Sequence, residues 1–149
     1  MQGAVRVTCA TCGQGNRVPQ ERLGAGPKCG SCGEALMDGR VAEFDLAAHD
    51  KATRLDEVPT IIDYWAPWCG PCRMMAPEYA KAALALKGQV RFAKINTEDH
   101  AGVSQRLGIR GIPLLILWHR GREVARLPGA RPAAEIEGFV RSNMVGSGF

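Results

Sequence analysis

The stretch Asp63-Tyr64-Trp65-Ala66-Pro67-Trp68-Cys69-Gly70-Pro71-Cys72 decides how the rest of the chain folds. Before it, Thr60-Ile61-Ile62 is a short β-branched run that predicts a buried strand. After it, residues 73–87 are rich in Ala, Leu, Met and Lys and end at Gly88, which predicts a helix. Two cysteines therefore lie where a strand turns into a helix.

This position suits a reactive thiol. The first turn of a helix has unpaired N–H groups and the positive end of the helix dipole, so a thiolate at Cys69 is stabilised. Cys72 follows one helical turn later, close enough to form a disulfide with Cys69. Pro71 fits the first turn, where its missing N–H costs nothing. This context favours redox chemistry over a structural or metal-binding CxxC pair.

The run Trp-Cys-Gly-Pro-Cys at 68–72 closely resembles the active site of the thioredoxin family. A thioredoxin-like Cys69 would attack a substrate disulfide and form a mixed disulfide, which Cys72 would then resolve. Asp63 lies in an apolar strand, where burial would raise its pKa and suit it to proton transfer near neutral pH. By resemblance, Asp63 matches the family's buried aspartate and Lys94 matches its lysine neighbour. The alternative for Asp63 is a hydrogen-bonded structural carboxylate, and the alternative for Lys94 is a solvated surface lysine.

Pro113, in Gly111-Ile112-Pro113, is the second signature of the family. Resemblance implies a cis peptide bond beside the two cysteines, with the backbone of Ile112 free to pair with an extended substrate. The chain departs from many thioredoxins in having Leu114 after this proline, which bears on substrate preference. The predicted substrate-contacting residues are Trp68, Gly70, Pro71, Gly111, Ile112 and Gly129.

Residues 1–40 differ from the rest of the chain. They hold two CxxC pairs, Cys9-Ala10-Thr11-Cys12 and Cys29-Gly30-Ser31-Cys32, separated by 16 residues. Each pair can present both sulfurs from one tight turn, and Gly13 and Gly33 let the backbone bend back toward them. Four thiolates form a closed tetrahedral shell for one structural Zn²⁺; an iron–sulfur cluster and free or disulfide-paired cysteines are the alternatives.

A segment this short and glycine-rich is expected to have almost no apolar core, so zinc would supply most of its folding free energy. It lacks clustered aromatic and basic residues, which favours contact with a partner protein or the adjacent domain over nucleic acid. With this segment in front, the chain resembles the bacterial thioredoxin-2 branch of the family, whose N-terminal cysteines bind zinc.

The predicted organisation is a zinc-binding segment at 1–40, with a linker at 37–40, and a thioredoxin domain at 41–149. The second part is expected to fold as a mixed sheet flanked by helices, in the order β-α-β-α-β-α-β-β-α. The strands are predicted at 41–44, 58–65, 89–96, 113–119 and 122–127. The helices are predicted at 46–55 with Asp45 as N-cap, at 73–87 with a kink at Pro77, at 99–107 and at 132–144.

The composition limits the kinds of partner that the chain is expected to bind. A formal net charge of +4, with no Lys/Arg run longer than two residues, does not indicate nucleic-acid binding. The longest apolar run, 112–118, is too short to cross a bilayer, and residues 1–10 do not resemble a signal peptide. The expectation is a cytoplasmic monomer with no organic cofactor. By resemblance, its partners would be thioredoxin reductase and oxidised substrate proteins.

Several residues receive a structural interpretation. His49, His100 and His119 have no cysteine at metal spacing and are predicted to lie on the surface. Met74 and Met75 are interpreted as helix packing, and Trp65 as packing beneath the site. Three functions remain open: a general protein-disulfide reductase, an oxidant or isomerase, which would need an oxidising compartment, and a zinc-centred redox-sensing or binding module.

Overall fold

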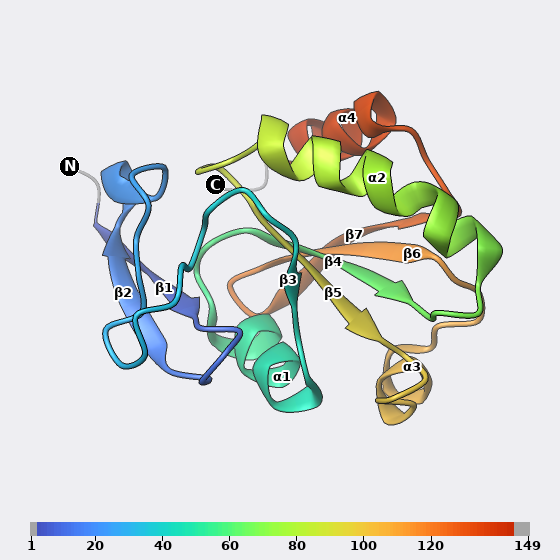
Figure 1. The fold of residues 1–149 in the computed structure, drawn as a ribbon, viewed down its shortest axis with the longest axis horizontal. Coiled ribbons are helices and arrows are strands. Elements are labelled where there is room, and N and C mark those ends of the chain that lie inside the picture. Colours follow the sequence, from blue (N-terminus) through green and yellow to red (C-terminus); the bar gives the residue numbers. More distant parts are fainter. Residues whose placement is uncertain (1–2, 145–149) are drawn as a thin grey trace.

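The computed structural model describes residues 3–144. A small N-terminal ribbon lies against one end of a larger α/β domain (Figure 1). The ribbon contains β1 (Ala4–Thr8), β2 (Gly15–Pro19) and the short 3-10 helix η1 (Gln20–Arg22). The larger domain contains β3 (Ala42–Glu43), α1 (Leu46–Leu55), β4 (Thr60–Trp65), α2 (Gly70–Ala85), β5 (Arg91–Asn96), α3 (Gly102–Leu107), β6 (Leu114–His119), β7 (Arg122–Pro128) and α4 (Ala133–Met144).

The larger domain has the predicted order of elements. Its five-stranded sheet runs β3-β5-β4-β6-β7, with β3 and β4 parallel to β5 and with β6 antiparallel to both β4 and β7. The β6–β7 hairpin turns at Arg120 and Gly121, both at positive φ, as a tight two-residue turn requires. The structure thus confirms a mixed sheet flanked by helices.

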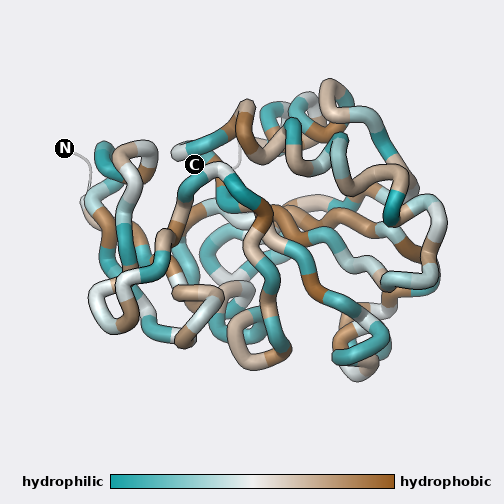
Figure 2. Tube along the Cα trace, in the orientation of Figure 1, coloured by the Kyte–Doolittle hydropathy of each residue, from teal (hydrophilic) through white to brown (hydrophobic). Residues whose placement is uncertain are grey.

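The helices cover both faces of this sheet (Figure 1). α2 and α4 pack on one face around Ile61 and Leu115, and α1 and α3 pack on the other around Ile62 and Ile116. Neighbouring residues of β4 point to opposite faces because side chains alternate along a strand. Apolar segments accordingly follow the central strands (Figure 2). No helix in the described part of the chain is long and apolar enough to span a membrane.

The observed ends of the helices agree better with the predictions made from capping residues than with those made from composition. α1 has the predicted bounds, and the Asp45 carboxylate accepts the backbone N–H of Ala48 at 2.8 Å. α2 begins at Gly70, three residues before the predicted start, because Cys69 acts as its N-cap. α3 begins at Gly102 and not at residue 99, and it ends at Leu107 as predicted, with Gly108 as its C-cap in the left-handed conformation.

The N-terminal ribbon has its own apolar core, so the prediction of almost none was wrong. β1 and β2 form an antiparallel hairpin, and Val5, Val7 and Val18 are buried with Leu23 and Leu36. Residue 37, predicted to begin the linker, is also buried in this core. Both zinc and this apolar core can therefore stabilise the ribbon.

A buried polar clamp fastens the ribbon to the larger domain. Asp56 accepts the backbone N–H of Thr8 at 2.9 Å and the Thr8 hydroxyl at 2.6 Å. The Arg91 guanidinium donates to the Thr8 carbonyl and lies 3.7 Å from Asp56. Beside this clamp, Glu57 accepts the backbone N–H of Arg6 at 2.9 Å. The ribbon therefore docks on the adjacent domain, which was one of the two contacts expected from its composition.

Candidate active site and metal centre

Cys69 and Cys72 form a disulfide at the N-terminus of α2, with their Cα atoms 5.2 Å apart. Both residues are buried, and the backbone N–H of Cys72 points at Cys69 Sγ from 3.2 Å. Pro71 lies in the first helical turn, as predicted. A Cys69 thiolate in this position would have a backbone donor and the positive end of the helix dipole beside it.

The loop before β6 lies against this pair. The Ile112–Pro113 peptide bond is cis, as predicted, and the Ile112 carbonyl oxygen is 3.8 Å from Cys69 Sγ. Gly129 donates its backbone N–H to the Pro113 carbonyl at 3.0 Å, which ties the end of β7 to the loop. Leu114 is buried at the start of β6, so its side chain belongs to the core.

The surroundings of the disulfide differ in exposure. Trp68 is 66% exposed, and Gly111 and Gly129 are exposed on neighbouring loops, whereas Gly70 and Ile112 are half-buried. An exposed indole beside a buried sulfur offers apolar contact area to a partner. Of the predicted substrate-contacting residues, Trp68 and Gly70 flank Cys69 in the chain and Ile112 lies against its sulfur.

Asp63 is buried beneath the disulfide. One of its carboxylate oxygens, Oδ1, has no hydrogen-bond partner among the described residues. Burial raises the pKa of Asp63 to about 7, and the positive charge of Lys94 partly opposes this shift. A cavity of about 360 Å³ is lined by Asp63 together with Cys72, Trp65 and Lys94. This cavity gives the carboxyl a route toward the second cysteine.

Lys94 is half-buried, not fully solvated. It is the register partner of Asp63 on β5. Its ammonium lies 4.8 Å from the centre of the Trp65 ring and 3.5 Å from the Glu43 carboxylate. Trp65 thus lies beside the lysine at the rim of the cavity that reaches Asp63.

The four N-terminal cysteines form a single cluster whose sulfur atoms all lie within 4.8 Å of one another. The two knuckles have the same hydrogen bonds: Gly13 donates to the Cys9 carbonyl and Gly33 to the Cys29 carbonyl, each at 2.9 Å. Both glycines have φ near +80°, which explains the choice of residue. Four thiols at this separation fit the tetrahedral shell of Zn²⁺. The geometry supports the predicted metal site.

Two of the three histidines are buried, so their prediction as surface residues was wrong. His49 is 1% exposed on the inner face of α1, and His119 is 5% exposed at the end of β6. His49 Nε2 lies 2.8 Å from the Tyr64 hydroxyl, whose oxygen also accepts the indole N–H of Trp118 at 3.1 Å. Ala48 and Ala52 are the other small residues of this buried helix face, and in the sequence they give too weak an apolar signal to place His49 inside.

The two methionines after the active site differ in exposure. Met75 is 1% exposed and packs in the core as predicted, whereas Met74 is 75% exposed, which corrects its interpretation as packing.

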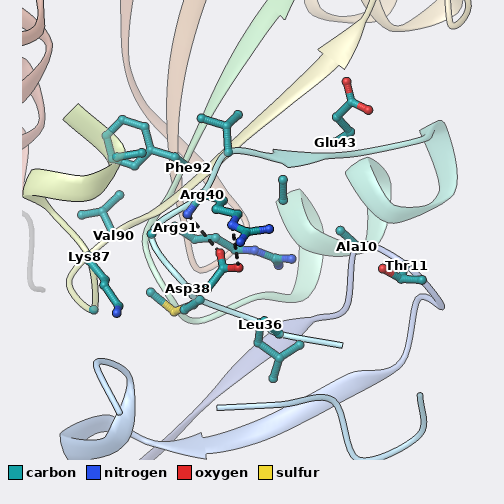
Figure 3. A pocket seen from close by; sticks show the side chains of 17 residues that line it. Ala10, Thr11, Leu36, Asp38, Arg40, Glu43, Lys87, Val90, Arg91 and Phe92 are labelled. Atoms are coloured by element: carbon teal, nitrogen blue, oxygen red, sulfur yellow. Dashed lines mark hydrogen bonds and ion pairs between the residues drawn. The ribbon is translucent and has the colours of Figure 1, made fainter. Parts of the chain in front are cut away.

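At the other end of α2, a cavity of about 330 Å³ lies between the ribbon and the larger domain (Figure 3). Arg40 and Asp38 form an ion pair at its edge, 3.6 Å apart. None of the residues predicted to act in catalysis lines this cavity.

Comparison with known proteins agrees with this geometry. Residues 40–142 match the thioredoxin family, and residues 8–34 match the N-terminal zinc ribbon described as "Thioredoxin 2, N-terminal". Thioredoxin C-3 of Corynebacterium nephridii is 40% identical over 131 residues, which is 88% of this chain and 90% of that protein. A thioredoxin of Haemophilus influenzae is 36% identical over 88 residues, which is 59% of this chain and 82% of that protein. The structure of chloroplastic thioredoxin z matches with a TM-score of 0.64 at 28% identity, covering 72% of this chain and 96% of that one.

The chain therefore belongs to the thioredoxin family of thiol–disulfide oxidoreductases, and its Cys69–Cys72 disulfide fits the family's Cys-Gly-Pro-Cys active site. Within that family, the zinc ribbon in front of the catalytic domain is the feature of the thioredoxin-2 subfamily.

Proposed function

We propose that this chain acts as a general protein-disulfide reductase that is recharged by an NADPH-linked thioredoxin reductase. The observation that carries the proposal is the disulfide at the N-terminus of α2, with the exposed Trp68 on one side and the cis Pro113 loop on the other. A helix N-terminus favours the thiolate, and an open backbone segment beside the sulfur gives an extended substrate a place to pair.

Catalysis proceeds by two exchanges. After the reductase opens the Cys69–Cys72 disulfide, the Cys69 thiolate forms a bond to one sulfur of the substrate disulfide and the other substrate sulfur leaves. The Cys72 thiol then loses its proton and attacks Cys69, which releases the reduced substrate and restores the disulfide. Cys69 is the N-cap of α2 and the Cys72 N–H points at its sulfur, so Cys69 is the attacking thiolate. Cys72 lines the inner cavity with Asp63, so it resolves the intermediate.

Asp63 accepts the proton that Cys72 releases. Its pKa, raised to about 7 by burial, lets it hold and release a proton at neutral pH, and the cavity it shares with Cys72 supplies the path. Lys94 tunes this carboxyl from the neighbouring strand. Substrates dock over Trp68, Gly70, Pro71, Gly111, Ile112 and Gly129.

The ribbon carries one structural Zn²⁺ held by Cys9, Cys12, Cys29 and Cys32. A shell of four thiolates has no open position for a substrate, so the ion stabilises the two knuckles and takes no part in the exchange. We divide the chain at residue 40 into the ribbon and the catalytic domain. The active site is complete within one chain, which suits a monomer, and zinc-bound thiolates suit a reducing compartment such as the cytoplasm.

Reduction of insulin disulfides with NADPH and thioredoxin reductase tests the proposal. The wild type is expected to turn over, and Cys69→Ser is expected to be inactive because it lacks the attacking sulfur. Met74→Ala, at an exposed position on the same helix, serves as the matched control and keeps its activity. If the wild type does not accept electrons from the reductase, or Cys69→Ser still turns over, the reductase assignment is wrong and an oxidant or binding role takes its place.

A further inference from the structure

The start of α2, which carries Cys69 and Cys72, and the N-terminal ribbon with its four cysteines lie at opposite ends of the molecule (Figure 1). α2 has 16 residues and starts at the active site; Gly88, just past its other end, lies against Gly24 of the ribbon. At 1.5 Å per residue, the helix is about 24 Å long. β4 gives a second measure of the distance between the ribbon and the active site. Val58, just before β4, donates its backbone N–H to the Arg6 carbonyl of the ribbon, and β4 ends at Trp65, near the active site. The sulfurs of one cluster are therefore far outside bonding distance of the other.

The ribbon is not free to close this gap. Thr8, which directly precedes Cys9, is held by two hydrogen bonds to the buried Asp56 carboxylate and accepts one from Arg91. The first knuckle is also held from α1, because Lys51 donates to the Gly13 carbonyl at 3.3 Å. A ribbon anchored in this way keeps its cysteines away from the active site of its own chain.

The four ribbon sulfurs form two close pairs across the knuckles. Cys9 Sγ lies 3.6 Å from Cys32 Sγ, and Cys12 Sγ lies 3.6 Å from Cys29 Sγ. In each pair one residue is buried, Cys9 or Cys29, and the other is exposed, Cys32 or Cys12. A disulfide formed within either pair would present one sulfur that an outside thiolate can reach, with a sheltered sulfur as the leaving group.

We propose that the oxidised ribbon of one molecule is a substrate for the Cys69–Cys72 dithiol of a second copy of this chain. The inference rests on the proposed reductase function and names one substrate of that same site. It gives the exposed positions of Cys12 and Cys32 a role, since these are the sulfurs that the second molecule attacks.

The chemistry balances with peroxide as the oxidant. Two ribbon thiolates and two protons reduce one peroxide to two waters and form one disulfide, and the ribbon then loses its zinc. Cys69 of the second molecule forms a bond to Cys12 or Cys32, and the buried partner leaves as a thiolate. Cys72 then attacks Cys69, frees the ribbon thiol and closes its own disulfide. Two such rounds restore four thiols and consume two NADPH through the reductase.

A trapping experiment tests the attack. The recipient is the full chain with Cys69→Ser and Cys72→Ser, treated with peroxide and freed of zinc. The donor is zinc-loaded, reduced chain with Cys72→Ser, which cannot resolve the intermediate. We expect a covalent heterodimer, and peptide mapping should find Cys69 bonded to Cys12 or Cys32. Donor with Cys69→Ser is the matched control and should form no adduct.

A kinetic experiment tests whether the reaction occurs between molecules. Wild-type chain with an oxidised ribbon is incubated with NADPH and excess reductase, and recovered thiols are counted by alkylation and mass spectrometry while zinc uptake is followed with a metal indicator. Reaction between copies predicts that the half-life of the oxidised ribbon halves when the chain concentration doubles. A half-life independent of concentration would mean reduction within one molecule or directly by the reductase, and either would overturn the proposal.

The remaining outcomes separate this inference from the function on which it rests. Wild-type donor that reduces insulin but leaves the oxidised recipient unchanged would overturn the inference and leave the reductase function standing. Donor that reduces neither would contradict the reductase function itself. A mixed disulfide to Cys9 or Cys29 would contradict the assignment of the exposed sulfurs as the points of attack.

Discussion

Asp63 and Lys94 are register partners on adjacent parallel strands, yet the Lys94 ammonium is paired with Glu43, 3.5 Å away. Asp63 Oδ1 has no hydrogen-bond partner among the described residues. A buried carboxyl without a direct counter-ion favours its protonated form, so burial raises the pKa of Asp63. The charge of Lys94 lowers this pKa, but by less than burial raises it. The ion pair with Glu43 thus leaves Asp63 able to exchange a proton near pH 7.

The first prediction concerns stability and pH. The pKa of Asp63 is about 7 in the folded chain and 3.8 in the unfolded chain, so between these values the folded state holds a proton that the unfolded state has lost. Stability should fall as pH rises through this window and stay low above pH 7. Asp63→Asn removes the penalty, and at pH 8 we expect it to raise the free energy of unfolding by up to about 4 kcal/mol, at 1.36 kcal/mol per pKa unit.

Urea denaturation between pH 4 and pH 8 measures this effect. The exposed Glu98→Gln is the matched control, since its carboxylate is solvated, and it should leave the pH slope unchanged. Asp63→Asn should also slow insulin reduction at pH 7, because the proton acceptor is lost. Equal stability of wild type and Asp63→Asn at pH 8 would contradict the burial argument.

The second prediction concerns the charge on β5. Because Lys94 lowers the pKa of Asp63, Lys94→Gln should raise that pKa, and Glu43→Gln should lower it by leaving the lysine charge unbalanced. Titration of the Asp63 carboxyl by NMR gives both shifts directly. The pH at which insulin reduction reaches half its maximum should move in the same two directions. Shifts of the same sign in both variants would show that Glu43 does not act through Lys94.

The third prediction concerns the buried imidazole. Burial lowers the pKa of His49 below 6.5, so below that pH the unfolded chain binds a proton that the folded chain does not. The contribution of His49 to stability is complete above pH 6.5 and declines as pH falls. His49 Nδ1 lies 3.0 Å from the Asp50 carboxylate, which can only accept, so the neutral imidazole accepts the Tyr64 hydroxyl proton at Nε2. His49→Phe should flatten this acid limb but leave that proton without an acceptor, which costs about 1–3 kcal/mol.

A double variant separates the two effects. His49→Phe with Tyr64→Phe removes both the imidazole and the stranded hydroxyl but leaves the Trp118 indole N–H without its acceptor, so we expect it to recover only part of the stability lost in His49→Phe at pH 7. Thermal unfolding at pH 5 and pH 7 measures all three chains. A double variant no more stable than His49→Phe would place the loss in packing and not in the hydrogen bond.

The fourth prediction concerns the metal. Removing zinc should reduce the amide protection of β1 and β2, while β4 and β6 keep theirs, because the ribbon core takes only Val58 from the larger domain and the cores of the large sheet have no zinc ligand. Hydrogen exchange before and after chelation measures this, together with zinc content. Cys12→Ser should lower the zinc content below one per chain, and Ser31→Ala, an exposed knuckle residue, should retain it. Loss of protection along β4 on chelation would contradict the prediction.

Features with local signals were predicted from the sequence. The Asp45 cap, the Arg120-Gly121 turn and the two CxxC knuckles each depend on residues a few positions apart, so the bounds of α1, the β6–β7 hairpin and the cysteine cluster agree with the prediction. The cis bond at Pro113 came from resemblance, since proline alone makes a cis bond uncommon.

Features that depend on distant partners were missed. The clamp joins Thr8 to Arg91, 83 residues further on, and no periodicity connects them. The ribbon core was missed because glycine-rich composition outweighed the alternation of Val5 and Val7, which marked a strand. Residue type alone predicts an exposed His49, and only tertiary packing shows that its helix face is the buried one.

The fifth prediction concerns the clamp itself. Asp56→Asn leaves the buried Arg91 guanidinium without its carboxylate and weakens both hydrogen bonds from Thr8, so we expect a loss of about 3–5 kcal/mol in the free energy of unfolding. Asp38→Asn is the matched control, because its ion pair with Arg40 is exposed and is worth less than about 1 kcal/mol. Urea denaturation measures both variants. Insulin reduction by folded Asp56→Asn should remain near the wild-type rate, since the clamp lies at the far end of β4 from the active site. A comparable loss of stability in both variants would show that the buried carboxylate has no special part in docking the ribbon.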